Sequence, residues 1–148
     1  MQILLRILLS AVLLSGIGLP LSSQTGKESD IKQLWTDCKL DKELSYGIFR
    51  TAILGLNKLD GVKNRSIISI IDYSRPSTEK RFYLIDLENK QLLYRCFVAH
   101  GKNTGENTAK SFSNISGSLQ SSLGFYLTGE TYTGDNGYSL KLDGLKKV

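Results

Sequence analysis

The chain has 148 residues, which is room for a single domain. Its 19 Lys and Arg outnumber 14 Asp and Glu, so the formal net charge is +5. The basic residues are spread along the chain, and the lack of a dense basic run argues against nucleic-acid binding. Two cysteines and one histidine, with no CxxC pair and no cluster of ligands, argue against a zinc site. We expect no metal and no cofactor.

The N-terminus has the order of features of a secretory signal peptide. Arg6 is followed by an apolar run over Ile7–Leu14, then by Pro20 and small residues. We predict a signal peptide over residues 1–23, with cleavage after Ser23. An uncleaved N-terminal anchor is the alternative. The prediction places the protein in the periplasm or cell envelope of a bacterium, in contact with the membrane only during export.

Two helices are predicted after this segment. Residues Gln24–Ser29 are polar, and we expect them to be disordered. A helix fits Asp30–Leu40, because apolar residues recur there at spacings of three and four. A second helix fits Ser45–Leu59, with Ser45 as its N-cap and Asp60-Gly61 at its end. We assign residues 24–61 to a helical N-terminal segment.

Residues 62–148 have the pattern of strands, and the fold class predicted for the chain is α+β. Apolar and β-branched runs alternate with turn signals in this region. The spans that we predict as strands are Ser66–Tyr73, Arg81–Leu87, Gln91–Ala99, Gly124–Thr128 and Ser139–Leu142. The second and third should form a hairpin, and residues 134–137 should form a turn between the last two.

The two cysteines are compatible with one disulfide in an oxidising compartment. Cys38 lies in the helical pattern and Cys96 in an apolar strand. Cysteine often serves as a small core residue, so two separate buried thiols are the preferred interpretation. The sequence does not decide whether the two residues meet.

The span Val98–Tyr132 is rich in Gly, Ser, Thr and Asn, yet apolar residues interrupt it at intervals. A flexible linker of this polarity would lack such anchors. We therefore expect an ordered loop that packs its apolar residues and presents its polar ones, as a binding cleft requires. The expected anchors are Phe112, Ile115, Leu119, Leu123, Phe125, Tyr126 and Leu127.

Most of this strand-rich region resembles a known family. The similar segments are IIDYSRPSTEKRFYLIDLENKQLLY, VAHGKNTGENTAKSFSNISGSLQSSLGFYLTGETY and GYSLKLDGL, preceded by the helix ELSYGIFRTAILGL. Their order resembles the first part of the catalytic domain of the murein L,D-transpeptidases of the YkuD-like group. The resemblance implies an L,D-transpeptidase-like fold over residues 62–148.

The resemblance also implies a reaction and a partner. In such enzymes, a cysteine thiolate attacks the carbonyl at the L-centre of diaminopimelate in a tetrapeptide stem and expels the terminal D-Ala. An amine of another stem then displaces the thiolate from the thioester, which cross-links the peptidoglycan. In the family, an Ile-His-Gly segment and a Ser-x-Gly-Cys-Pro segment carry this chemistry, downstream of the segment similar to SLKLDGL. Neither occurs before Val148. We therefore expect a partial domain, incomplete at its C-terminus, without catalytic residues and inactive by itself, whose partners are peptidoglycan stem peptides.

Ten residues are candidates for lining the substrate cleft. They are His100, Gly101, Asn103, Asn114, Gly117, Ser118, Ser121, Ser122, Gly124 and Tyr126. Their side chains and flexible glycine backbone suit an extended peptide, although Ser and Asn in turns also satisfy one another. We expect a structural or substrate-lining role for His100 rather than a catalytic one.

Two other functions remain open. One is a non-catalytic envelope protein that binds peptidoglycan or a partner protein, and the other is an enzyme that uses Cys96 or Cys38 as its nucleophile. No feature of the sequence indicates an oligomeric state.

Overall fold

A computed structural model describes residues 21–135 and 137–145. Most of the predicted signal peptide, and Asn136 in the predicted turn, lie outside these residues. The elements are α1 (Leu21–Asp37), α2 (Tyr46–Lys58), β1 (Ile67–Ile71), β2 (Phe82–Asp86), β3 (Gln91–Cys96), β4 (Tyr126–Gly134) and β5 (Gly137–Gly144). Two helices followed by antiparallel strands confirm the predicted α+β class.

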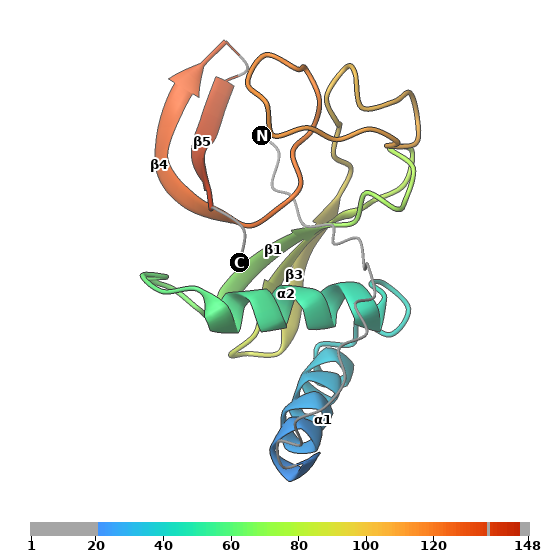
Figure 1. Ribbon diagram of the computed structural model, residues 1–148, viewed down its shortest axis with the longest axis vertical. Helices are drawn as coiled ribbons and strands as arrows, with labels where there is room; N and C mark the ends of the chain where they lie inside the picture. Colours follow the sequence, from blue (N-terminus) through green and yellow to red (C-terminus); the bar gives the residue numbers. More distant parts are fainter. Residues whose placement is uncertain (1–20, 136, 146–148) are drawn as a thin grey trace.

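The strands form two sheets. β1, β2 and β3 make an antiparallel sheet in that order, and β4 pairs with β5 as a separate hairpin. Figure 1 shows α2 lying across one side of the three-stranded sheet. The β4–β5 hairpin and the long β3–β4 connection lie toward the other side of that sheet. Neighbouring residues of a strand face opposite sides, so Ile70 packs with the helices and Ile71 packs with the β3–β4 connection.

Helix α1 begins earlier than expected, so the prediction of disorder over Gln24–Ser29 was wrong. The Glu28 carboxylate accepts hydrogen bonds from the Tyr46 hydroxyl at 2.6 Å and from Arg50 Nε at 2.7 Å. The segment Gln24–Ser29 is polar and has no apolar stripe of its own, and these contacts with α2 hold it in place. The predicted cleavage point after Ser23 lies within α1. None of the helices in the described ranges is long and apolar enough to cross a membrane.

Helix α2 follows its prediction closely. Ser45 is the N-cap, and its side chain accepts a hydrogen bond from the Ile48 backbone N–H at 3.4 Å. The buried face of the helix includes Gly55, which packs directly against the ring of Phe125. A Cβ at position 55 would lie 1.9 Å from a ring carbon, so glycine is required for this contact. The contact fixes the start of the β4–β5 hairpin against α2.

The predicted β2–β3 hairpin is confirmed, whereas the bounds of several strands differ from prediction. β3 ends at Cys96 rather than at Ala99. β4 starts at Tyr126 rather than at Gly124 and continues to Gly134, and β5 extends beyond its predicted span at both ends. The added residues are polar or exposed and pair through the backbone. An exposed two-stranded ribbon lacks the alternation that marks a half-buried strand.

The apolar residues form two clusters. The larger lies between the helices and the sheet and contains Cys38 and Phe49, and the smaller contains Ile71 and Tyr73. Cys38 and Cys96 are both free, so they form no disulfide; Cys38 is buried as expected, whereas Cys96 is only partly buried.

Candidate functional site

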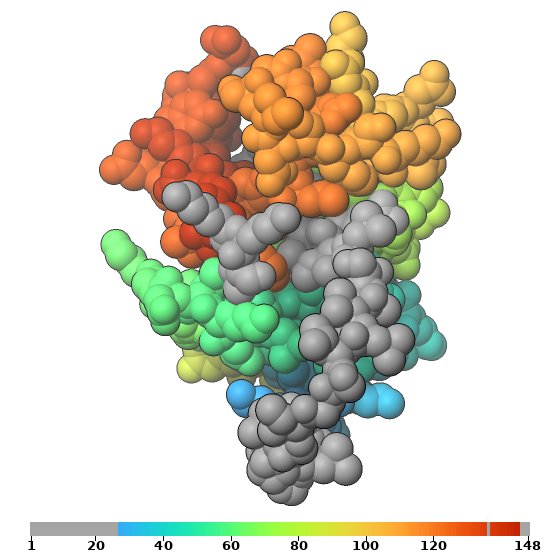
Figure 2. All heavy atoms as spheres, viewed as in Figure 1, coloured from blue at the N-terminus to red at the C-terminus, as the bar shows by residue number. Residues whose placement is uncertain are grey.

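Residues 98–124 make up nearly all of the connection between β3 and β4. They are the part of the predicted cleft span Val98–Tyr132 that precedes β4, and we call this segment the cleft loop. Figures 1 and 2 show it in yellow and orange, forming a lobe beside the β4–β5 hairpin. Phe112 and Leu123 pack on the smaller apolar cluster, so these two anchors are confirmed. Ile115 and Leu119 are 77% and 61% exposed, so the expectation that they pack inward was wrong.

Hydrogen bonds join the first and last parts of the cleft loop. The Gly101 backbone N–H donates to Ser121 Oγ at 2.9 Å, and the Asn103 backbone N–H donates to the Leu119 carbonyl at 3.0 Å. The Asn103 side-chain amide donates to the Ser118 carbonyl at 3.0 Å. A Cβ at position 101 would lie 2.5 Å from the Leu119 carbonyl oxygen, so this close approach requires glycine.

Thr104 lies at the centre of the cleft loop and is fully buried. Its hydroxyl accepts from the Ser121 backbone N–H at 2.7 Å. Its carbonyl accepts from the backbone N–H groups of Lys110 and Ser111 at 2.8 and 3.0 Å. Sequence reasoning missed Thr104, and the only signal was a threonine hydroxyl between two glycine-containing turns. The cleft loop is therefore an ordered structure with its own polar centre.

The tip of the cleft loop holds two residues in the left-handed region, Gly117 at φ 80° and Leu119 at φ 56°. This conformation is unfavourable for leucine. It persists because the Leu119 carbonyl accepts from Asn103 and because Ser118 Oγ accepts from the Gln120 N–H at 3.3 Å.

The ten predicted site residues do not all face solvent. Ser121 is buried, and its hydroxyl accepts a hydrogen bond from the Gly101 backbone N–H. Tyr126 starts β4 and packs on the smaller apolar cluster. His100, Gly101, Ser118, Ser122 and Gly124 are half-buried. Asn103, Asn114 and Gly117 are exposed and are best placed to meet a ligand.

His100 uses both of its ring nitrogens within the protein. Nδ1 lies 2.7 Å from Arg81 Nη2, and Nε2 lies 2.9 Å from the Gly105 carbonyl oxygen. Arginine can only donate, so Nδ1 accepts and Nε2 carries the hydrogen that is donated to Gly105. The ring is therefore the neutral Nε2–H tautomer. Neither ring nitrogen is left to take a proton from Cys96.

Arg81 is fully buried, and sequence reasoning missed it. Its Nε and Nη2 donate to the Val98 carbonyl at 3.1 and 2.9 Å, and its Nη1 donates to the Arg75 carbonyl at 2.9 Å. The guanidinium also lies 4.8 Å from the centre of the Tyr73 ring. Burial lowers the pKa of Arg81 and raises that of Tyr73. Three acceptors and an aromatic face thus hold a buried cation.

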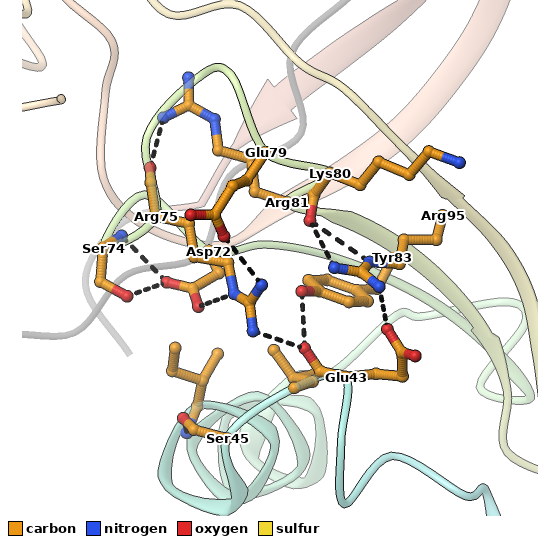
Figure 3. Close-up of polar contacts among 12 residues, drawn as sticks. Glu43, Ser45, Asp72, Ser74, Arg75, Glu79, Lys80, Arg81, Tyr83 and Arg95 are labelled. Carbon is orange, nitrogen blue, oxygen red and sulfur yellow. Dashed lines mark hydrogen bonds and ion pairs between the residues drawn. The ribbon is translucent and has the colours of Figure 1, made fainter. Parts of the chain in front are cut away.

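The turn that leads into Arg81 is tied to the rest of the molecule by a polar network (Figure 3). Arg75 donates to the Glu43 carbonyl at 3.1 Å and pairs with Asp72 and Glu79 at 3.7 and 3.1 Å. The Tyr83 hydroxyl donates to the same Glu43 carbonyl at 2.8 Å. This network connects the segment before α2 to the central strand β2 and to the turn that leads into Arg81.

The Cys38 thiol does not have the surroundings of a nucleophile. Burial raises the pKa of the Cys38 thiol, and Cys38 packs in the larger apolar cluster. Cys96 is partly buried on β3. In the part of the chain that the structure describes, no group of three or more His, Cys, Asp or Glu side chains could hold a metal ion.

A separate groove of about 730 Å³ lies between α2, β1 and the β4–β5 hairpin. Its lining is mostly apolar and includes Leu56, Ile67 and Leu140. Of the predicted site residues it contains only Tyr126. The polar surface of the cleft loop and the apolar groove are therefore distinct features.

The sequence profile of the L,D-transpeptidase catalytic domain matches residues 40–148. The chain therefore belongs to the L,D-transpeptidase catalytic domain family, whose members act on peptidoglycan. Comparison with curated proteins and with solved structures gave no significant match.

Proposed function

We propose that the cleft loop forms the substrate-facing wall of an L,D-transpeptidase and binds the peptide stems of peptidoglycan. The observation that carries the proposal is the family match, together with the order of the cleft loop inside the matched span. Asn103 and Asn114 are exposed. Their Nδ2 groups donate to the Ser118 and Leu123 carbonyls, which leaves their side-chain oxygens, with the open backbone at Gly117, to pair with an extended peptide.

The second part of the proposal is that these 148 residues do not catalyse cross-linking by themselves. They contain neither an Ile-His-Gly nor a Ser-x-Gly-Cys-Pro segment. The thiol of Cys38 is buried, and His100 has no nitrogen left for Cys96. A cysteine acyl transfer needs a thiolate beside a base, and the described residues do not combine the two.

A turnover assay with a tetrapeptide stem donor tests this part. We expect the 148-residue protein to release no D-Ala and to form no cross-linked dimer. Variants with Cys38 and Cys96 replaced singly and together, and protein treated with iodoacetamide, serve as controls. Activity that disappears when Cys96 or Cys38 is replaced would instead establish a complete enzyme with that nucleophile.

The alternative function is a non-catalytic envelope protein that binds peptidoglycan. The observation that favours it is the same ordered cleft loop without a nucleophile beside it. A pull-down on purified sacculi, with a basic protein of matched charge as control, tests binding. Retention above the control without turnover supports this function, and no retention above the control rules it out.

We also propose export to the periplasm or cell envelope, supported by the order of charged, apolar and small residues over residues 1–23. Mass spectrometry of protein recovered from the periplasm is the test. A mature chain that starts at Gln24 supports cleavage, whereas an intact N-terminus in a membrane fraction supports the anchor.

A further inference from the structure

The buried cation of Arg81 is one of the contacts that position the start of the cleft loop, beside the Tyr73 hydroxyl, which donates to the Ala99 carbonyl at 3.4 Å. Arg81 precedes β2, and its guanidinium spans the carbonyls of Val98 and Arg75 and the ring of His100. Two of these partners are the first residues of the cleft loop. A lysine has one nitrogen and cannot span acceptors that the planar arginine fork reaches from three nitrogens.

Through its two ring nitrogens, His100 connects Arg81 to Gly105, which lies further along the cleft loop. Because Arg81 fixes Nδ1 as an acceptor, Nε2 carries the hydrogen and donates to the Gly105 carbonyl. Gly105 lies in a tight turn, where a Cβ would be 2.2 Å from the Thr108 carbonyl oxygen. If His100 carried a hydrogen on Nδ1, as it does when protonated or in its other tautomer, that hydrogen would point at the Arg81 Nη2 hydrogens. Two donors would then meet with no acceptor between them.

The segment of residues 98–101 also affects where the exposed residues of the cleft loop lie. Gly101 follows His100 directly and donates to Ser121, while Asn103 holds the carbonyls of Ser118 and Leu119. A shift at residues 98–100 therefore moves both sides of the cleft loop, including the exposed amide of Asn103.

We propose that Arg81 is a positioning residue, which acts through the ring of His100 to hold the cleft loop in the arrangement that binds the peptide stem. This inference rests on the proposed function, since it assumes that the cleft loop is the binding wall. Arg81 itself touches no substrate, because it is fully buried.

The first test needs no variant. The chain contains one histidine, so a long-range ¹H–¹⁵N spectrum shows a single imidazole. At neutral pH we expect the Nε2–H tautomer with an Nε2 hydrogen that exchanges slowly with water. An imidazolium, or a ring protonated at Nδ1, would overturn the proposal.

The second test measures the affinity of a soluble disaccharide-tetrapeptide for four variants. Arg81→Lys and His100→Leu should weaken binding about tenfold, the effect of losing a hydrogen bond to a charged group. His100→Gln keeps one donor and one acceptor and should rescue most of the affinity, which it could not do for a catalytic base. Arg95→Lys is the matched control, because Arg95 also lies over a tyrosine ring but contacts Lys80 and Glu43 rather than the cleft loop.

The outcomes separate the inference from the proposed function. If wild-type protein does not bind the tetrapeptide, the proposed function fails, and amide exchange at Gly101 and Ser121 still reports whether Arg81 orders the cleft loop. If Arg81→Lys does not fold, His100→Leu removes the same contact from the loop side. Folded variants that bind and exchange like wild-type protein would overturn the inference.

Discussion

At the scale of single residues, burial decides which reactive groups can act. Cys38 lies in the larger apolar cluster at 1% exposure, and its surroundings disfavour the thiolate. Cys96 is partly buried on β3, which is an edge strand of the three-stranded sheet. The two thiols should therefore differ in chemistry although both are reduced.

We predict that iodoacetamide modifies Cys96 in the native protein and leaves Cys38 unmodified. The reason is that burial raises the pKa of the Cys38 thiol and also blocks access of the reagent. Mass spectrometry of peptides after timed alkylation measures both sites. Alkylation in denaturant should equalise the two rates, and equal rates in the native protein would contradict the structure.

At the scale of elements, α2 contacts both α1 and the residue that precedes the β4–β5 hairpin. Its N-terminal half contacts α1 through Tyr46 and Arg50, and Gly55 receives the ring of Phe125 from the start of the hairpin. Phe125 also packs at the edge of the larger apolar cluster. Changes along α2 should consequently have effects that depend on position.

Gly55→Ala should destabilise the protein by about 1–3 kcal/mol, because the added methyl overlaps the Phe125 ring and the overpacking outweighs the gain in helix propensity. Gly47→Ala is the matched control in the same helix, since nothing lies within 4 Å of a Cβ there. It should leave the free energy of unfolding unchanged or raise it. Urea unfolding of both variants is the measurement, and an equally tolerated Gly55→Ala would show that Phe125 packs elsewhere.

The contact between α1 and α2 should make stability depend on acid pH. Hydrogen bonds from Tyr46 and then Arg50 lower the pKa of the Glu28 carboxyl below its ordinary value. Because the folded state favours the ionised form, this contribution is present above the ordinary pKa and is lost as pH falls through the lowered one.

Glu28→Gln should therefore lower the melting temperature at neutral pH and converge with the wild-type protein in strong acid. Thermal unfolding followed by circular dichroism over that pH range is the measurement. Glu106→Gln, which changes an exposed glutamate of the cleft loop, is the control for loss of one charge. A constant difference between Glu28→Gln and wild-type protein at every pH would show that the carboxyl does not titrate through this contact.

Local pattern was sufficient to predict α2, its Ser45 cap and the β2–β3 hairpin, because each depends on residues a few positions apart. The early start of α1 depends on Glu28 contacting Arg50, 22 residues away. The ordering of the cleft loop depends on Arg81 contacting His100, 19 residues away, and on Thr104 contacting Ser121, 17 residues away. Such pairings have no local signal, so the candidate span was predictable whereas its organising residues were not.

At the scale of the whole molecule, the β4–β5 hairpin packs beside three connected parts: a helical base, a three-stranded sheet and a polar loop that is fixed to that sheet. The network around Glu43, Arg75 and Arg81 connects the three, so the position of the cleft loop follows from the fold. The L,D-transpeptidase family acts on peptidoglycan, which is the polymer that we propose the cleft loop binds.

The most direct test of a substrate-binding wall is a titration of ¹⁵N-labelled protein with a soluble disaccharide-tetrapeptide, followed by amide chemical shifts. We expect saturable shifts concentrated in residues 98–124, with the largest at Asn103, Asn114 and Gly117 and none along α1. A disaccharide without the peptide should give no shifts there. Absent shifts, or shifts confined to the helices, would contradict the assignment of the cleft loop as the peptide-binding wall.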